Sequence, residues 1–321
     1  MLNMNKKLEQ REKEGKIIKC GIVGAGQMGR GMVTQMVLMK GITPAVVSDI
    51  DLELAVHAFK YAGVKDADIV RTNEVAEADK AMDEGKYVAT TNSNLISQCR
   101  PVEVAIDATG VPDVGAKVAT DAINNKKHVV MLNVETDVVI GPLLDKMAKD
   151  NGVIYTGSAG DEPGAVMELY DFATAMGLEV KVMGKGKNNR IDKNCNPDTV
   201  LEEATRRKMS PKMLCAFKDG TKTMVEMTAM SNATGLVPDV IGGHGIASDV
   251  KSLNETYKLK EDGGILKQHG VVEYVNGIAP GVFVTVATDN EEIAYQMQYH
   301  SMGPGPLLSL IHISEPTRLD V

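Results

Sequence analysis

The sequence predicts an α/β protein in which a doubly wound parallel sheet comes first and an α+β domain follows. In the first half, short runs of β-branched residues alternate with segments whose apolar residues recur at helical spacing. These runs are apolar almost throughout, as is typical of strands that are covered on both faces. After Gly157 the alternation stops. We therefore expect a charged extension over residues 1–15, a first domain over 16–157 and a second over 158–306.

The alternation also predicts where the elements of each domain lie. Residues 75–98 interrupt the rhythm of the first domain and predict an extra helix and a short edge segment. The strands expected there are 16–24, 44–49, 102–108, 127–133 and 152–157, with helices over 28–41, 51–63, 111–126 and 141–152. In the second domain we expect a helix ending near Gly177, a strand over 179–184, a helix from Asp219 or Thr221 to about Thr234, and two strands beside a Gly-Pro turn within 271–292.

Composition excludes several classes of protein. The net charge of −8 and a pI near 5.4 argue against nucleic acid or an anionic membrane as the partner. No apolar run reaches the roughly 18 residues of a membrane helix, and the charged start lacks the centre of a signal peptide. The scattered cysteines indicate neither a disulfide framework nor a zinc site; they are Cys20, Cys99, Cys195 and Cys215. We expect a cytoplasmic homo-oligomer without a metal.

A glycine motif marks the end of the first strand. In GIVGAGQMGRGM the glycines Gly24, Gly26 and Gly29 form G-x-G-x-x-G, and Gln27 and Met28 begin the following helix. The first glycine permits a tight turn, the second lets a pyrophosphate approach the backbone, and the third lets the helix pack on the strand. The helix N-terminus then offers N–H groups to phosphate. This context predicts a Rossmann-type dinucleotide site.

Asp49 ends the second strand, where an acid can accept both ribose hydroxyls of an adenosine. Its charge disfavours a 2′-phosphate, although Lys60 and Arg71 could still reach one. We therefore expect NAD(P), with a preference for NAD.

Two further loops are predicted at the carboxyl edge of the sheet, where such folds bind ligands. The first offers Asp107, Thr109 and Gly110 as cofactor contacts, and the second offers Asn133 and Glu135. Alternatively, Asp107 only caps the helix that follows it.

The segment GKGKNN raises the question of a substrate site. Lys185, Lys187, Asn188 and Asn189 follow a strand, and the neighbouring Gly184 and Gly186 would let a ligand approach. Ammonium and amide groups suit a carboxylate or phosphate. We expect these residues to bind a small anionic substrate, while a solvated turn is the alternative.

The segment 217–239 predicts an apolar helix that carries a lysine and a glutamate on one face. Lys222 and Glu226 lie four residues apart, and Asn232 follows as a substrate contact. A buried lysine paired with an acid can transfer protons, so Lys222 is the candidate proton donor, with Asp219 or Glu226 orienting it. An exposed ion pair is the alternative.

Four segments carry a family resemblance over about 16–306. The segments GSAGDEPGAVMELYDFATAMGLEV, GKGKNN, DGTKTMVEMTAMSNATGL and PGVFVTVAT resemble homoserine-dehydrogenase-like oxidoreductases that often carry a SAF domain, some of them described as deoxyxylulose phosphate reductoisomerase-like. The resemblance implies NAD(P)-dependent hydride transfer at a carbonyl or alcohol carbon, with a lysine assisting proton transfer.

One departure keeps other functions open. Homoserine dehydrogenases usually have a lysine in the loop after the fifth strand, and this chain has LNVETD there. A reductoisomerase or sugar-acid oxidoisomerase remains an alternative, for which Asp161, Glu162 or Glu168 would hold a divalent metal. A non-catalytic nucleotide-sensing subunit is the alternative of another class.

The last segment does not fit the rest. LSLIHISEPTR, residues 308–318, matches the translation of a common transposase-type sequencing adapter. We expect the native sequence to end near Pro306 or Leu307, with 307–321 as a non-native tail.

Overall fold

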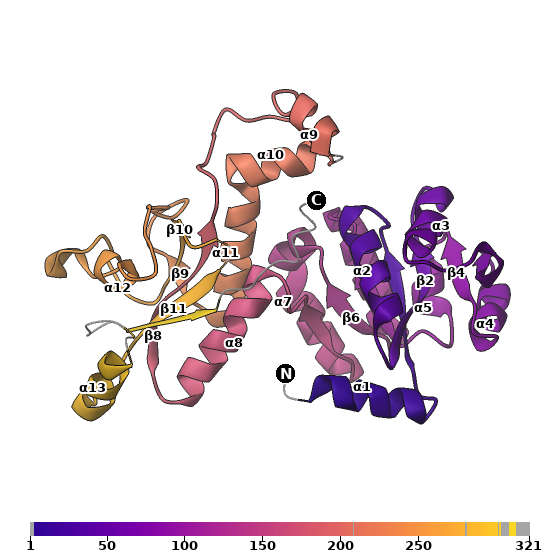
Figure 1. Cartoon of the computed structure of the whole chain (residues 1–321), viewed down its shortest axis with the longest axis horizontal. Helices are drawn as coiled ribbons and strands as arrows, with labels where there is room; N and C mark the ends of the chain where they lie inside the picture. The colour runs from indigo at the N-terminus through magenta and orange to yellow at the C-terminus, as the bar shows by residue number, and fades with distance from the viewer. Residues whose placement is uncertain (1–2, 208, 280, 301, 303–307, 313–321) are drawn as a thin grey trace. The chain divides into compact units, whose positions relative to one another are not determined.

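A computed structural model describes residues 3–207, 209–279, 281–300, 302 and 308–312. The chain divides into two compact units, Met1–Ser158 and Ala159–Val321 (Figure 1). The division falls close to the expected boundary after Gly157. Most of the expected tail, including residues 313–321, lies outside the described residues, whereas Leu308–His312 forms a strand, β12.

Unit 1 contains a seven-stranded sheet in the order β3-β4-β2-β1-β5-β6-β7, and every neighbouring pair is parallel. This arrangement confirms the predicted doubly wound sheet. The strands are β1 (Ile18–Val23), β2 (Ile42–Ser48), β3 (Ile69–Arg71), β4 (Tyr87–Thr90), β5 (Val104–Asp107), β6 (His128–Met131) and β7 (Tyr155–Gly157).

Helices cover both faces of this sheet because its strands place apolar side chains on each side. Ile22 and Val47 pack into one core, whereas Val23 and Val46, their neighbours in sequence, pack into the other. The helices of unit 1 are α1 (Met4–Lys13), α2 (Gln27–Leu38), α3 (Leu52–Tyr61), α4 (Val75–Asp83), α5 (Asn94–Gln98), α6 (Pro112–Asn124) and α7 (Val134–Asn151).

The structure corrects two expectations in unit 1. Residues 75–98 form α4, β4 and α5, but β4 lies inside the sheet and is not the expected edge segment. The strand at that edge is β3, which the sequence pattern did not predict. With three residues, β3 is too short for alternation to show. Helix α7 begins at Val134, seven residues before the expected start at 141, because the Asn133 side chain accepts a hydrogen bond from the Thr136 N–H and caps it.

Unit 2 contains a mixed sheet in the order β12-β11-β8-β10-β9. The central strand β8 is parallel to β10 and antiparallel to β11, so the two strands beside the expected Gly-Pro turn flank β8 and do not pair with each other. The turn residue Pro280 lies outside the described residues. The strands are β8 (Glu179–Lys187), β9 (Val237–Pro238), β10 (Val271–Asn276), β11 (Val282–Ala287) and β12 (Leu308–His312).

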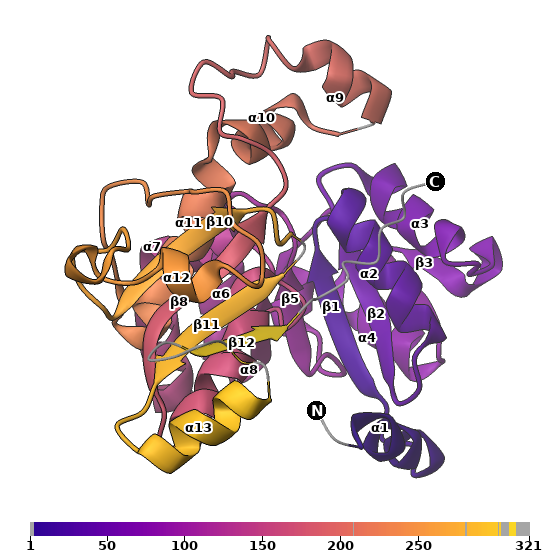
Figure 2. The same ribbon diagram turned by 60° about the vertical axis from the view of Figure 1, so that its left-hand side comes forward.

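Helices α8 and α11 cover one face of this sheet, which Figure 2 shows from another side. Helices α9 and α10 project from the end of α11, away from the strands, in both views. The helices of unit 2 are α8 (Glu162–Ala175), α9 (Leu201–Arg207), α10 (Pro211–Asp219), α11 (Thr221–Thr234), α12 (Leu253–Thr256) and α13 (Glu291–Tyr299). Together, the units confirm the predicted fold class.

The segment Gly184–Lys187 belongs to β8 and is not a loop, which corrects the expectation for GKGKNN. A Cβ on Gly184 would lie 2.3 Å from the Glu273 carbonyl oxygen, and one on Gly186 would lie 2.4 Å from the Ala279 nitrogen. The glycines therefore serve close packing on one face of the strand. Because side chains alternate along a strand, Lys185 and Lys187 share the opposite face.

Substituting Gly184→Ala should destabilise unit 2, because the added methyl group meets backbone and the Phe283 ring at 2.6 Å. Overpacking of this kind costs about 1–3 kcal/mol, which thermal unfolding followed by circular dichroism would detect. Gly160→Ala is the matched control, since a Cβ there has no neighbour within 4 Å. Equal melting temperatures for the two variants would contradict this explanation of the glycine.

Candidate functional site

In unit 1, two of the three motif glycines are required by the protein's own packing. Gly24 has φ +95°, and a Cβ there would lie 2.9 Å from the Ala108 carbonyl oxygen. A Cβ on Gly29 would lie 1.9 Å from the Gly24 carbonyl oxygen. These contacts account for the tight turn and for the close packing of α2 on β1.

The packing of the chain does not require a glycine at position 26. A Cβ there would have no neighbour within 4 Å, and no side chain caps α2, whose N-cap residue is Gly26. Gln27 and Met28 are exposed beside it. The first turn of α2 therefore presents backbone N–H groups to open space, which is the arrangement that binds a phosphate. These features fit the pyrophosphate of a dinucleotide.

Asp49 lies beside this turn, as expected. Its Oδ2 accepts a hydrogen bond from the Ala25 N–H at 2.7 Å, which fixes the carboxylate next to the glycine loop. Lys60 and Arg71 both form ion pairs with Asp66, at 2.7 and 2.6 Å. Since Asp66 engages both cations, the local charges favour a ribose diol over a 2′-phosphate.

Asp107 and Asn133 support the neighbouring loop, and their expected role as cofactor contacts stays a prediction. Asp107 is fully buried; its Oδ1 accepts from the Thr109 N–H and its Oδ2 from the Asn133 amide, at 3.0 and 2.8 Å. Burial raises the pKa of Asp107. The same Asn133 amide donates to the Val111 carbonyl oxygen. This network shapes the loop that carries Thr109 and Gly110, which stay predicted contacts, as does Glu135 in the first turn of α7.

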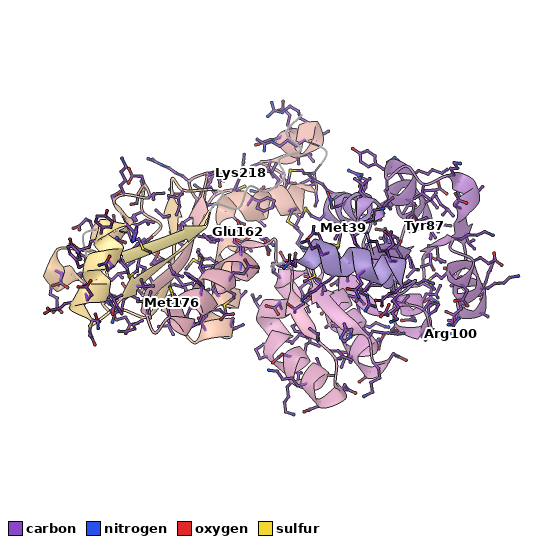
Figure 3. The ribbon with its side chains drawn as sticks, turned by 60° about the horizontal axis from the view of Figure 1, so that its bottom comes forward. Met39, Tyr87, Arg100, Glu162, Met176 and Lys218 are labelled. Atoms are coloured by element: carbon purple, nitrogen blue, oxygen red, sulfur yellow. The ribbon has the colours of Figure 1, made fainter. Side chains whose placement is uncertain are left out.

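Several charged side chains of unit 2 lie around Lys185. This lysine is 6% exposed, and its ammonium group donates to Glu162 Oε1 at 2.8 Å and to Glu226 Oε2. Glu162 begins α8, where Figure 3 labels it, and Glu226 projects from α11. Three elements thus place one cation between two carboxylates on the face of the sheet that α8 and α11 cover. We call these residues, with Asp161 and Lys222, the Lys185 cluster.

The cluster separates the pKa values of its carboxyl groups. Burial raises the pKa of Glu226 to about 7, although Lys185 partly offsets the shift. Burial also raises the pKa of Asp161 to about 6, against the opposing charge of Lys222. Burial works in the same direction on Glu162, yet Lys185 holds the pKa of that carboxyl below its usual value. Groups with such separated pKa values are typical of sites that transfer protons.

Lys185 itself stays charged. Burial alone would lower its pKa, but the carboxylates of Glu226 and Glu162 raise that pKa above its usual value. The ammonium is thus already paired with two glutamates, and its expected role in binding a substrate anion stays a prediction.

The predicted catalytic residues on α11 are only partly brought together. Lys222 and Glu226 lie one turn apart and act on the same cluster, since the charge of Lys222 bears on Asp161. Glu226, however, pairs with Lys185 and does not orient Lys222. Asp219 is also assigned a different role, because its Oδ1 accepts from the Thr221 N–H at 2.8 Å at the start of α11.

Of the predicted substrate residues beyond Lys185, the structure brings Lys187 and Asn189 together but not Asn188 or Asn232. Lys187 is buried and donates to the Asn189 side chain and the Phe217 carbonyl oxygen, both at 2.8 Å. Burial, followed by the like charge of Lys185, lowers its pKa. Asn188 is exposed. Asn232 is exposed as well, six residues after the buried Glu226, a spacing at which two side chains do not share a helix face.

Three carboxyl groups of the cluster also lie close enough to hold a metal ion. Asp161, Glu162 and Glu226 each offer an oxygen within 4.8 Å of the others, and Asp161 Oδ2 is buried without a hydrogen-bond partner. Glu168, the other acid considered for a metal, is exposed. The donor set suits a hard divalent cation, although Lys185 already engages two of its members.

Sequence reasoning overlooked Glu162 as the partner of Lys185. The two residues are 23 positions apart, on a helix start and a mid-sheet strand, so no local spacing connects them. In the sequence, the acidic pair Asp161-Glu162 at the start of an apolar helix could have indicated a partner for a buried lysine.

Comparison with known proteins places unit 2 among oxidoreductases. Residues 160–314, just under half of the chain, match the family model described as "Oxidoreductase DRL, catalytic domain". The match supports the prediction of an oxidoreductase, and its limits resemble those of unit 2. No curated protein matched the chain.

Solved structures with similar folds include several dehydrogenases. An NAD binding oxidoreductase from Klebsiella pneumoniae aligns at 15% identity and a TM-score of 0.39, over 56% of this chain and 45% of that one. Scyllo-inositol dehydrogenase from Lactobacillus casei, with bound NAD(H) and scyllo-inositol, aligns at 12% identity and 0.48, over 92% and 76%. The chain thus spans under half of the Klebsiella protein's length.

Among the described helices, none has both the length and the hydropathy of a membrane span.

The open space at Gly26 leads to a test that separates binding from stability. Gly26→Ala should weaken NAD binding by about tenfold or more, because its methyl group would occupy the space of the pyrophosphate while touching nothing in the protein. Titration calorimetry measures the affinity. Gly29→Ala should instead lower thermal stability, since its Cβ meets backbone. Unchanged NAD affinity in Gly26→Ala would contradict the assignment.

Proposed function

We propose that the chain is an NAD(P)-dependent oxidoreductase that interconverts an alcohol and a carbonyl on a small metabolite. The observation that carries the proposal is the Lys185 cluster, in which Glu226 has a pKa of about 7 beside a charged lysine. The cluster lies in the segment that matches an oxidoreductase catalytic domain. Unit 1 contributes the dinucleotide site at Gly26 and Asp49.

Interconversion of an alcohol and a carbonyl moves a hydride and a proton. A nicotinamide cofactor, when bound, supplies the chemistry of the hydride. The chain must then move the proton, which requires a group that changes protonation near neutral pH. Glu226 meets this requirement, whereas Glu162 does not, because Lys185 keeps it ionised.

In the direction of alcohol oxidation, ionised Glu226 accepts the proton while Lys185 holds its carboxylate in place. In the direction of reduction, the protonated carboxyl returns it. Lys222, one turn earlier on α11 and half-buried, is proposed to contact the substrate oxygen and to stabilise developing negative charge there. The role of proton donor expected for Lys222 thus passes to Glu226, and Lys222 keeps that of substrate contact.

The proposed substrate class follows from the contacts that the two buried lysines already make. Lys185 is paired with two glutamates and Lys187 with carbonyl and amide oxygens, so neither lysine is committed to a substrate anion. This favours a hydroxyl-rich or hydroxycarbonyl substrate over one that depends on a strong anion. The homoserine-dehydrogenase likeness, the cytoplasmic location and the homo-oligomer stay part of this proposal.

A reductoisomerase is the second candidate, and the proximity of Asp161, Glu162 and Glu226 favours it. A divalent cation there would take Glu226 and Glu162 away from Lys185 and bind substrate oxygens next to them. The rearrangement would then depend on added metal.

One screen tests both candidates. Purified protein is mixed with NAD or NADP and with polyols, hydroxy acids, semialdehydes and sugar phosphates, with and without a chelator, and nicotinamide absorbance is followed. We expect turnover with an alcohol or hydroxycarbonyl substrate, preference for NAD, and no loss with the chelator. Loss with the chelator would favour the reductoisomerase. Cofactor binding without turnover on any substrate would favour a nucleotide-sensing subunit.

The pH profile tests the role of Glu226. Because the carboxylate is the base, alcohol oxidation should rise with pH through about 7, and carbonyl reduction should fall over the same range. Glu226→Gln should lower turnover by about 10²–10⁴-fold and abolish the dependence of turnover on pH around 7. Glu168→Gln, an exposed acid on α8, is the control and should keep the profile. A profile that survives in Glu226→Gln would exclude Glu226 as the base.

A further inference from the structure

The arm formed by residues 188–219, with α9 and α10, has a small core of its own. In Figures 1 and 2 its helices extend beyond the end of α11. Lys218, which Figure 3 labels on α10, forms an ion pair with Glu203 on α9 and ties the two helices together. The core consists of Val200, Ala204, Leu214 and Cys215, with Cys195 and Met209 packed against it.

Two of the chain's four cysteines meet in this core. Cys195 is half-buried and packs against the core that contains the buried Cys215, and its nearness contributes to the raised pKa of the Cys215 thiol. The other two cysteines, Cys20 and Cys99, are buried in unit 1 and belong to different cores. Cys195 is therefore the most accessible thiol of the chain, and it has a second thiol beside it.

The buried thiol is connected to the Lys185 cluster through α10. Cys215 Sγ donates to Asp219 Oδ2 at 3.6 Å, and Asp219 Oδ1 accepts from the Thr221 N–H at the start of α11. That helix carries Lys222 and Glu226. The Phe217 carbonyl oxygen of α10 accepts from Lys187 on β8. A change at Cys215 thus acts on a helix that contacts α11 and β8, two of the three elements of the cluster.

We propose that Cys195 and Cys215 are an oxidation site, at which a peroxide closes a disulfide that lowers the activity of the enzyme. The Cys195 thiolate attacks one peroxide oxygen, so an S–O bond forms, the O–O bond breaks and water leaves. The Cys215 sulfur then attacks the sulfenic sulfur, an S–S bond forms, and the hydroxyl group leaves as a second water. Two thiols lose two electrons and two protons, and the peroxide is reduced to two waters.

The order of the steps follows from exposure. Burial, and then contact with Cys195, raise the pKa of the Cys215 thiol to about 11, so it is a poor first nucleophile. It becomes the resolving thiol once its neighbour is oxidised. The Asp219 carboxylate, which accepts its S–H, lies in position to receive the proton.

Closing the disulfide removes the S–H donor to Asp219 and draws α10 toward Cys195. The Asp219 contact at the start of α11 and the Lys187 contact then lose their support. The effect on turnover rests on the proposed function, whereas disulfide formation does not. Loss of a hydrogen bond to a charged group corresponds to a fall in turnover of about tenfold.

The experiment treats the purified full-length chain with hydrogen peroxide and counts free thiols under denaturing conditions. We expect the count to fall from four to two, with one peptide pair linked through Cys195 and Cys215 in the mass spectrum, and to return on addition of dithiothreitol. Cys20→Ala/Cys99→Ala, which alters only the unit 1 cysteines, should still form the linked pair. Cys195→Ser should not.

Activity is measured on the same samples with a substrate found by the screen. Turnover should fall on oxidation and recover on reduction, while Cys195→Ser should keep its turnover in peroxide. Four remaining thiols, a pair linked between two chains, or sulfinic acid at Cys195 without linkage would overturn the proposal. A linked pair with unchanged turnover would overturn the regulatory role alone. If no substrate is found, the thiol count still decides whether the site exists, independently of the proposed function.

Discussion

The buried ammonium of Lys185 between Glu162 and Glu226 is the interaction on which the organisation of unit 2 depends. A charge at 6% exposure is stable only when it is paired, and removing one partner of such a pair costs about 3–5 kcal/mol. The pair therefore fixes the start of α8 and the face of α11 against β8. Gly184 and Gly186 make this possible, because their lack of side chains lets the sheet pack closely on the face opposite the lysine.

In unit 1, glycines also permit close packing, but there they shape the turn between β1 and α2. Gly24 and Gly29 are needed so that backbone can approach backbone, whereas Gly26 touches nothing in the chain. The open position of Gly26 and the anchored Asp49 are the observations on which the proposed dinucleotide site rests. The two units thus divide the work of the proposed enzyme, with cofactor recognition in the first and proton transfer in the second.

The features that could be predicted from the sequence are those that short segments of it determine. Alternating strands and helices predicted the doubly wound sheet, and G-x-G-x-x-G with Asp49 predicted the tight turn before α2, since each signal lies within some 25 residues. The second sheet was harder, because β8 pairs with strands about 90 residues later. Because those strands lie so far along the chain, Lys185 was predicted to be a loop residue. Its partner Glu162 lies on another element and could not be inferred from sequence spacing.

The proposed chemistry requires that Glu226 exchange its proton near neutral pH beside a charged lysine. Infrared difference spectra between the wild-type chain and Glu226→Gln, recorded across pH, isolate the carbonyl stretch of this one carboxyl group. The account predicts a protonated-acid band that disappears with a midpoint near about 7. A midpoint close to the ordinary value of 4.5, or the absence of the band at every pH, would contradict it.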